Sequence, residues 1–171
     1  MNRLARLITA FILLTLSAFA GEPKTVRILT IGNSFSANAT RYLKDLAKAG
    51  GHTLIHNSLV IGGSSFQVHA DKTKAEGKAR LYSSGRDLIA NLTLDHWDYV
   101  TIQQTTLGMD GHHANLPGEY LGACVWYEVL FGDSPVGLAF IPKGLDAEFA
   151  RFLQETAHRA VVARSGGDSK L

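Results

Sequence analysis

The sequence predicts an α/β fold built on a parallel sheet of about three strands. Three short apolar segments, at about residues 26–31, 53–61 and 98–104, have the length and composition of buried strands. Helical patterns separate these segments, and each segment ends in a polar or glycine-rich turn. Strands that alternate with helices form right-handed βαβ crossovers, so the polar turns are expected at one edge of the sheet. Ligands bind at that edge in sheets of this kind.

The first twenty residues predict a secretory signal peptide. The stretch MNRLARLITAFILLTLSAFA has two early arginines, an apolar run and an A-x-A site at residues 18–20. A transmembrane anchor is the alternative, but the run is shorter than the ~20 apolar residues that cross a bilayer. We therefore expect a secreted or periplasmic protein with no membrane span after signal cleavage. One domain is expected at residues 21–163, followed by a disordered tail at 164–171.

Composition argues against several classes of partner. The 171-residue chain has a formal net charge of +2 with scattered basic residues, which does not favour nucleic acid or an acidic membrane surface. Cys124 is the only cysteine, so no intrachain disulfide can form, and its apolar helical surroundings place it in the core. No G-x-G-x-x-G motif follows the first strand, which argues against dinucleotide binding.

Helices are expected between and after the strands, because apolar residues recur there at helical spacing. Their expected ranges are about 38–49 with a stop at Gly50-Gly51, about 84–92, a helix with Pro117 in its first turn that closes at Gly132, and 146–163. The stretch between Gly63 and residue 84 is polar and gives no clear element.

Ser34 lies in the turn Gly32-Asn33-Ser34, directly after the first strand. A serine there would hold its hydroxyl at the sheet edge, close to backbone N–H groups that can face an anionic oxygen. Ser34 is therefore a candidate nucleophile. The alternative is that Ser34 or Ser36 only caps the helix that follows.

A serine nucleophile needs a base, and the base needs a group that orients it. Asp110 and His113 are three residues apart in a loop before an apolar helix, so both side chains can point into one cleft. His112 is then expected to point elsewhere. A metal site at Asp110, His112 and His113 is a weaker alternative, because adjacent histidines seldom share a metal and no further ligand is spaced to complete the shell. No metal or other cofactor is expected.

Four motifs stand in the order expected of one family: TIGNSFS, IGGSSF, WDYVTIQQ and DGHHAN. They resemble the SGNH hydrolases, also called GDSL-like esterases, and in particular a secreted bacterial branch known as the DUF4886 domain. The resemblance covers nearly all of the mature chain. It implies a three-layer α/β/α, flavodoxin-like fold.

The resemblance also implies a set of catalytic residues. By position, Ser34 corresponds to the nucleophile, His113 to the general base and Asp110 to the carboxylate that orients it. The oxyanion hole of the family uses the backbone N–H of the nucleophile and of a glycine after the second strand, here Gly63.

A third oxyanion donor in the wider family is an asparagine after the third strand, where this sequence has IQQTTLG. Gln103 or Gln104 offers an amide N–H at that place, and glutamine is the usual residue in the DUF4886-like branch. The alternative is that both glutamines are ordinary strand-end residues. His69, in GGSSFQVH, also resembles a feature of the branch and has no assigned role, and His52, His56, His96 and His158 are likewise unassigned.

The chain departs from the family pattern after the third strand. An SGNH domain has about five parallel strands, but only TTLGM separates Gln104 from Asp110, which indicates an internal deletion. Five residues span at most about 17 Å at ~3.3 Å per residue, enough to cross one neighbouring strand. Strand order 2-1-3 would therefore allow the triad to meet, while the outer flank of the third strand would be exposed.

These observations predict a secreted serine esterase that acts on a small-molecule or carbohydrate ester, for example an acetyl group on a sugar. The alternative is a catalytically dead or poorly folded remnant of such an enzyme, at most a carbohydrate-binding pseudoenzyme. The missing strands favour this alternative, whereas the intact motifs favour the enzyme.

Overall fold

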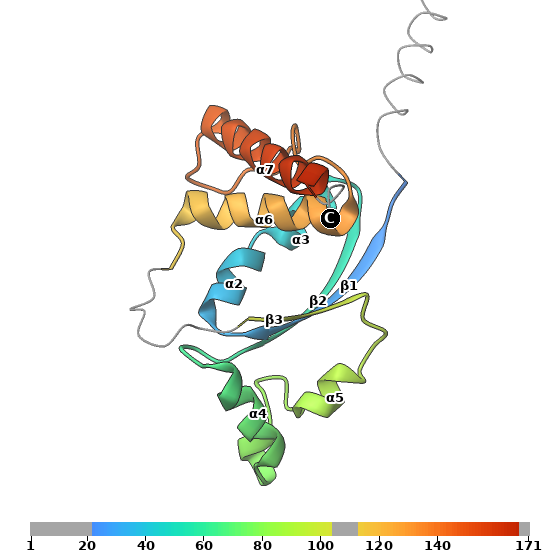
Figure 1. Cartoon of the computed structure of the whole chain (residues 1–171), viewed down its shortest axis with the longest axis vertical. Coiled ribbons are helices and arrows are strands. Elements are labelled where there is room, and N and C mark those ends of the chain that lie inside the picture. The colour runs from blue at the N-terminus through green and yellow to red at the C-terminus, as the bar shows by residue number, and fades with distance from the viewer. Residues whose placement is uncertain (1–21, 104–112, 168–171) are drawn as a thin grey trace, which may run out of the picture.

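The computed structural model describes residues 22–103 and 113–167. It is an α/β structure with helices on both faces of a small sheet, as predicted (Figure 1). The elements in chain order are β1 (Thr25–Gly32), α2 (Ser34–Thr40), α3 (Leu43–Ala49), β2 (Thr53–Val60), α4 (Phe66–Lys74), a 3-10 helix (Gly77–Arg80), α5 (Leu88–Leu92), β3 (Tyr99–Ile102), α6 (Leu116–Phe131) and α7 (Ala147–Gly167).

The sheet has three parallel strands in the order β2-β1-β3. The parallel direction was predicted, and the order is the one that would allow the triad to meet. β1 pairs with β2 along its whole length, from Thr25 opposite Thr53 to Gly32 opposite Val60. β3 is shorter and pairs only with the second half of β1. Because β1 is central, the turn at its carboxyl end is flanked by the ends of both neighbouring strands.

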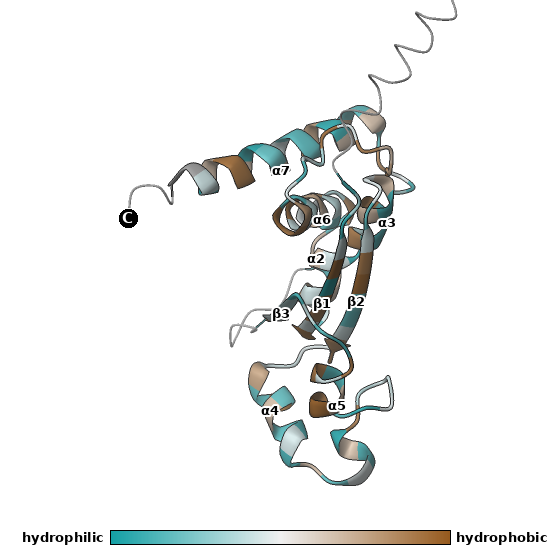
Figure 2. Cartoon of the chain, turned by 90° about the vertical axis from the view of Figure 1, so that its right-hand side faces the viewer, coloured by the Kyte–Doolittle hydropathy of each residue, from teal (hydrophilic) through white to brown (hydrophobic). Residues whose placement is uncertain are grey.

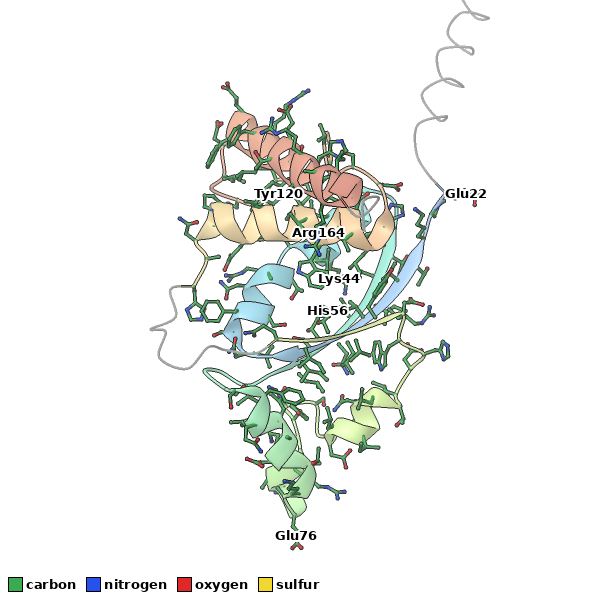
Figure 3. All side chains as sticks on the ribbon, viewed as in Figure 1. Glu22, Lys44, His56, Glu76, Tyr120 and Arg164 are labelled. Atoms are coloured by element: carbon green, nitrogen blue, oxygen red, sulfur yellow. The ribbon has the colours of Figure 1, made fainter. Side chains whose placement is uncertain are left out.

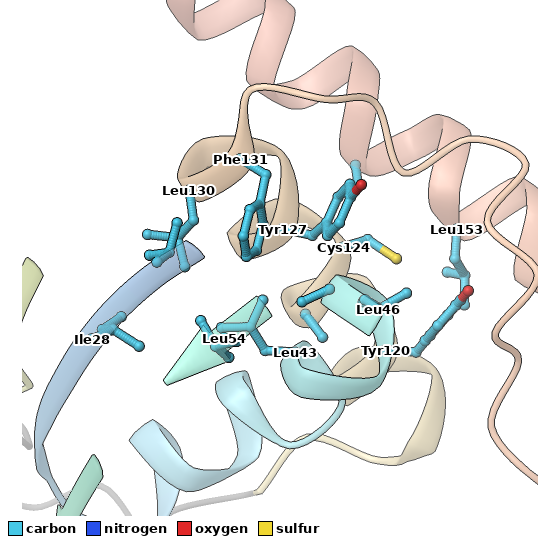
Figure 4. Close-up of a cluster of buried hydrophobic side chains, with 14 of the residues drawn as sticks. Ile28, Leu43, Leu46, Leu54, Tyr120, Cys124, Tyr127, Leu130, Phe131 and Leu153 are labelled. Carbon is cyan, nitrogen blue, oxygen red and sulfur yellow. The ribbon is translucent and has the colours of Figure 1, made fainter. Parts of the chain in front are cut away.

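Alternating side chains of β1 build two separate cores. Val26 and Ile28 face the larger core, which α3, α6 and α7 complete, and Figure 4 shows Tyr127 and Phe131 of α6 packed in this cluster. Leu29 and Ile31 face the smaller core on the opposite side of the sheet, under α4 and α5. Figure 2 shows the corresponding apolar stretches along β1 and β2. Helices thus cover both faces, as a parallel sheet requires.

The helix after Pro117 is present with the predicted ends. Asn115 caps α6 by accepting a hydrogen bond from the Gly118 N–H at 3.2 Å, and Pro117 lies in the first turn. Gly132 ends the helix in the left-handed conformation, with φ at 72°. Cys124 of α6 is buried, as predicted.

The last helix, α7, packs against α6. Its buried residues Ala150, Leu153 and Ala157 extend the larger core outward. The helix continues to Gly167, four residues beyond the predicted end. The disordered tail expected at 164–171 stays a prediction.

Two further predictions of helices were wrong in their boundaries. The single helix expected at 38–49 is two helices, and the first begins at Ser34 because Asn33 caps it. The helix expected at 84–92 is limited to Leu88–Leu92, since Asp87 caps it by accepting from the Ala90 N–H at 2.8 Å. α4 was not expected, because Phe66–Lys74 is too polar to show a helical apolar stripe.

The outer edge of β3 is apolar and exposed, as expected from the missing strands after it. Tyr99 is 43%, Val100 46% and Ile102 57% exposed, whereas the central strand β1 is buried along most of its length. Within residues 22–103 and 113–167, no helix combines the length and apolar character needed to span a bilayer.

Two glycines of α6 are expected to respond oppositely to alanine. Gly132→Ala should lower the free energy of unfolding by about 1–2 kcal/mol, because a Cβ disfavours the left-handed conformation. Gly122→Ala should raise it by about 0.5–1 kcal/mol, because a Cβ there meets Ala39 only at an ordinary 3.8 Å. Urea unfolding of the two variants measures both effects, and an unchanged stability of Gly132→Ala would contradict the left-handed helix end at Gly132.

The Cys124 thiol is expected to resist alkylation in the folded protein. Burial raises its pKa to about 12, so almost no thiolate is present at pH 8. Mass spectrometry after iodoacetamide treatment should show an unmodified chain, and the same chain in urea should react. Rapid reaction without urea would mean that α6 does not pack as described.

Candidate active site

The ends of all three strands meet around the turn Gly32-Asn33-Ser34. The Asn33 side chain is buried and makes two hydrogen bonds: Oδ1 accepts from the Phe35 N–H at 3.0 Å, and Nδ2 donates to the Ser64 carbonyl at 3.0 Å. Asn33 therefore caps α2 and ties β1 to the loop after β2. The helix cap is Asn33 and not Ser34 or Ser36. The alternative that Ser34 is present only to cap the helix is therefore excluded.

Ser34 lies next to His113, as predicted. The Ser34 Oγ and His113 Nε2 atoms are 2.6 Å apart, a short hydrogen bond between residues 79 positions apart in the chain. The Phe35 ring stacks on the imidazole, with ring centroids 5.2 Å apart and an interplanar angle of 10°. This contact limits rotation of the imidazole. The pair has the distance that proton transfer from a serine to a histidine requires.

The segment that carries His113 is fastened to α2 by a polar cluster. The Asn38 side-chain amide donates to the Ala114 carbonyl at 3.3 Å and to Glu119 Oε1 at 2.6 Å. Arg41 donates to the same Glu119 oxygen at 2.7 Å, and this hydrogen bond and the carboxylate charge raise the pKa of the Arg41 guanidinium. Because Glu119 is in the first turn of α6, the start of this helix is held beside α2.

Gln103 contacts the nucleophile turn directly. Its Oε1 atom accepts from the Asn33 N–H at 3.1 Å. The side chain also packs against Gly32, where an added Cβ would lie 2.9 Å from Gln103 Oε1 and 3.1 Å from the Ser36 Cβ. Gln103 is therefore more than an ordinary strand-end residue, because it holds the turn in place. Its role as an oxyanion donor stays a prediction.

The loop after β2 forms another side of the site. Gly63 has φ at 65°, a left-handed conformation that favours glycine, and it is exposed. The next residue, Ser64, is buried and accepts from Asn33. The loop that carries the predicted Gly63 donor is thus bonded to the turn that carries Ser34.

His69 is buried beneath this junction. The motif resemblance had placed it near the presumed cleft but had given it no role. Its Nε2 atom is 3.0 Å from the Gly32 carbonyl oxygen and 3.2 Å from Ser64 Oγ, and its Nδ1 atom is 3.0 Å from the Tyr82 hydroxyl. Burial lowers the pKa of His69, the bond to Gly32 opposes this effect, and the charge of Lys72 adds to it. The motif GGSSFQVH, which contains His69, was the signal in the sequence that placed it near the site.

The other histidines lie away from Ser34. His52 bonds Asp133 at 2.9 Å, and His158 bonds Glu128 at 2.8 Å. His56, labelled in Figure 3 with Lys44, bonds Thr30, and burial together with the Lys44 charge lowers its pKa. His96 is exposed. In the parts of the chain that the structure describes, no three His, Cys, Asp or Glu side chains group closely enough to hold a metal ion.

Several predicted features lie outside the described residues. They are the orienting carboxylate Asp110, the amide Gln104, the neighbouring histidine His112 and the signal peptide at 1–20. The structure therefore brings together Ser34, His113, Gln103 and the Gly63 loop, and Asp110 stays a prediction from the sequence.

Residues 27–107 match the DUF4886 family model, described as a domain of unknown function. The matched segment runs from β1 past β3 and includes Ser34, Gly63, His69 and Gln103, whereas His113 lies beyond it. The DUF4886 match agrees with the resemblance found in the motifs. A search of curated proteins found no match.

The fold is also similar to a crystal structure of a DUF4886 family protein from Bacteroides uniformis. The TM-score is 0.65 at 19% sequence identity, and the alignment covers 81% of this chain and 95% of that chain. At this identity the similarity shows a shared DUF4886-like fold.

Replacement of Asn33 is expected to cost more stability than replacement of another helix cap. Asn33→Ala should lower the free energy of unfolding by about 2 kcal/mol, because it removes the α2 cap and leaves the Ser64 carbonyl without this donor. Asn115→Ala removes an exposed cap and should cost about 1 kcal/mol. Equal losses in chemical denaturation would show that the bond to Ser64 contributes little.

Proposed function

We propose that this chain is a secreted esterase of the SGNH type, in which Ser34 is the nucleophile and His113 the general base. The observation that carries the proposal is the 2.6 Å contact between Ser34 Oγ and His113 Nε2, at the carboxyl edge of the sheet. This contact joins the Gly32-Asn33-Ser34 turn to the segment of His113, the two parts of the sequence in which a nucleophile and a base were predicted. Asp110 is the proposed carboxylate that orients His113.

The proposed reaction has two halves. In the first, His113 accepts the Ser34 proton as Oγ forms a bond to the ester carbonyl carbon, and the protonated imidazole then gives this proton to the departing alcohol oxygen. In the second, His113 accepts a proton from water, the hydroxide oxygen bonds to the acyl carbon, and the Ser34 oxygen leaves with the proton. No metal takes part in this scheme.

The oxyanion of each tetrahedral intermediate would lie near the backbone N–H groups of Ser34 and Gly63. Ser34 is the first residue of α2, where a backbone N–H has no acceptor within the helix itself. Donors of this type are worth about 3 kcal/mol each in the transition state. Gln103 supports this arrangement because its Oε1 atom accepts from the Asn33 N–H. The Nε2 group of the same side chain is the proposed third donor.

The proposed substrate is an ester of a small molecule or a carbohydrate, such as a sugar acetate. Support for this class comes from the motif resemblance and from the predicted export of the chain. The polar groups at the strand ends are compatible with a polar alcohol as the leaving group.

A second candidate is a pseudoenzyme that binds carbohydrate without catalysis, or a poorly folded remnant. The exposed apolar edge of β3 favours it, because such an edge lowers the solubility and stability of a small sheet. The short bond between Ser34 and His113 favours the enzyme, since a site without selection for catalysis has no need to keep this pair in contact.

A fluorophosphonate probe separates these candidates. The purified protein should be labelled, while Ser34→Ala and His113→Ala should lose labelling, because one lacks the attacking oxygen and the other the base. Ser36→Ala is the matched serine control, and His112→Ala is the matched histidine control; both should keep labelling. Asp110→Asn should slow labelling strongly.

Thermal unfolding of each variant provides the control for folding. A protein that melts cooperatively but stays unlabelled would exclude the esterase and favour the pseudoenzyme. Labelling that survives Ser34→Ala would assign the nucleophile to another residue.

A further inference from the structure

We propose that His69 is a positioning residue for the Ser34 site, an inference that rests on the proposed esterase function. His69 lies on α4, and its hydrogen bonds go to Gly32, Ser64 and Tyr82. Its Nε2–H is shared between both segments that supply the proposed oxyanion donors: the carbonyl of Gly32, two residues before Ser34, and the Oγ atom of Ser64, directly after Gly63. In this proposal His69 sets the distance between the Gly32 turn and the Ser64 loop.

The protonation pattern of the ring follows from its partners. The Gly32 carbonyl oxygen can only accept, so the His69 Nε2 atom must carry the hydrogen. In a neutral ring Nδ1 is then an acceptor, and the Tyr82 hydroxyl donates to it. His69 is only 1% exposed and Tyr82 7%, so water cannot readily replace either bond. Burial disfavours a charged ring and lowers the pKa of His69, which is consistent with this neutral form.

Tyr82 is itself held firmly, so it can fix the ring. Its ring stacks on His69 with centroids 5.8 Å apart and an interplanar angle of 17°. Lys72 of α4 lies 5.1 Å from the Tyr82 ring centroid and donates to the carbonyls of Ala79 and Leu81, which precede Tyr82. The segment before α5 is thus bonded to the same helix that carries His69.

The contact with Gly32 is not needed to satisfy a buried backbone group. The Gly32 carbonyl also accepts from the Ile61 N–H at 3.1 Å, so it keeps one hydrogen bond when His69 is replaced. Loss of the imidazole should therefore shift the turn and the glycine loop relative to each other more than it unfolds the sheet. A shift of about 1 Å in a catalytic arrangement can cost about 100-fold in rate.

The test compares two amides at position 69. In His69→Gln the amide nitrogen can reach the place of Nε2, whereas in His69→Asn the shorter side chain reaches only the place of Nδ1. Both variants lose the ring to the same extent. With 4-nitrophenyl acetate as the ester, His69→Asn should lower kcat by about 100-fold with a much smaller change in KM, and His69→Gln should recover most of kcat.

Several outcomes would overturn the inference. A folded His69→Asn variant with the kcat of wild type would show that the bond to Gly32 does not position the site. Equal losses in the Gln and Asn variants, or losses that follow only the folded fraction in thermal unfolding, would assign His69 a purely structural role. If wild type itself fails to react with both the ester and the fluorophosphonate probe, the proposed function fails, and the inference fails with it.

A measurement on wild type covers the case in which both variants fail to fold. In 15N NMR of the histidine-labelled protein, the protonated and bare nitrogens of a neutral imidazole have widely separated shifts, so the tautomer of His69 can be identified. A proton on Nε2 supports the inference, and a proton on Nδ1 or a charged ring at neutral pH contradicts it. Tyr82→Phe, which removes only the hydroxyl, should lower kcat by less than His69→Asn, and an unchanged kcat would remove Tyr82 from the proposal.

Discussion

The structure of the site depends on one side chain, Asn33, at the end of the central strand. Its amide accepts from the α2 backbone and donates to the Ser64 carbonyl, and its own N–H donates to Gln103. An aspartate would keep the cap but lose the donor, and a serine is too short to bridge to the β2 loop. An amide of this length therefore both caps α2 and reaches the β2 loop, while the link to β3 uses the backbone N–H of the same residue.

The second half of the site depends on the packing of α6. Tyr127 and Phe131 anchor the end of this helix in the larger core, while Glu119 ties its start to α2. His113 lies three residues before α6, so the packing of the helix sets where the imidazole can lie. This explains how a chain with few strands still brings His113 to Ser34.

The two faces of the small sheet differ in the size of the core that covers them. The face covered by α3 and α6 has a continuous core that α7 extends, whereas the opposite face has only a small cluster around Leu29 and Ile31. β3 closes one edge of the site through Gln103 but remains exposed along its outer flank. The nucleophile turn is therefore best supported from β1 and β2, and least from the side of β3.

The sequence by itself determined the parallel α/β class and the helix end at Gly132, and it identified Ser34 and His113 as candidates for one site. These follow from local patterns: apolar runs that end in turns, a glycine with the required left-handed conformation, and a histidine placed before an apolar helix. The start of α2, the helix α4 and the role of His69 were decided only by tertiary structure. The cap of α2 is local, from Asn33 to Phe35, but the Asn33 side chain is also held by Ser64, and His69 bonds Gly32 and Tyr82, which lie on other segments of the chain. A sequence pattern shows which side chains can form hydrogen bonds, but only the folded chain brings the two partners of a buried bond within reach.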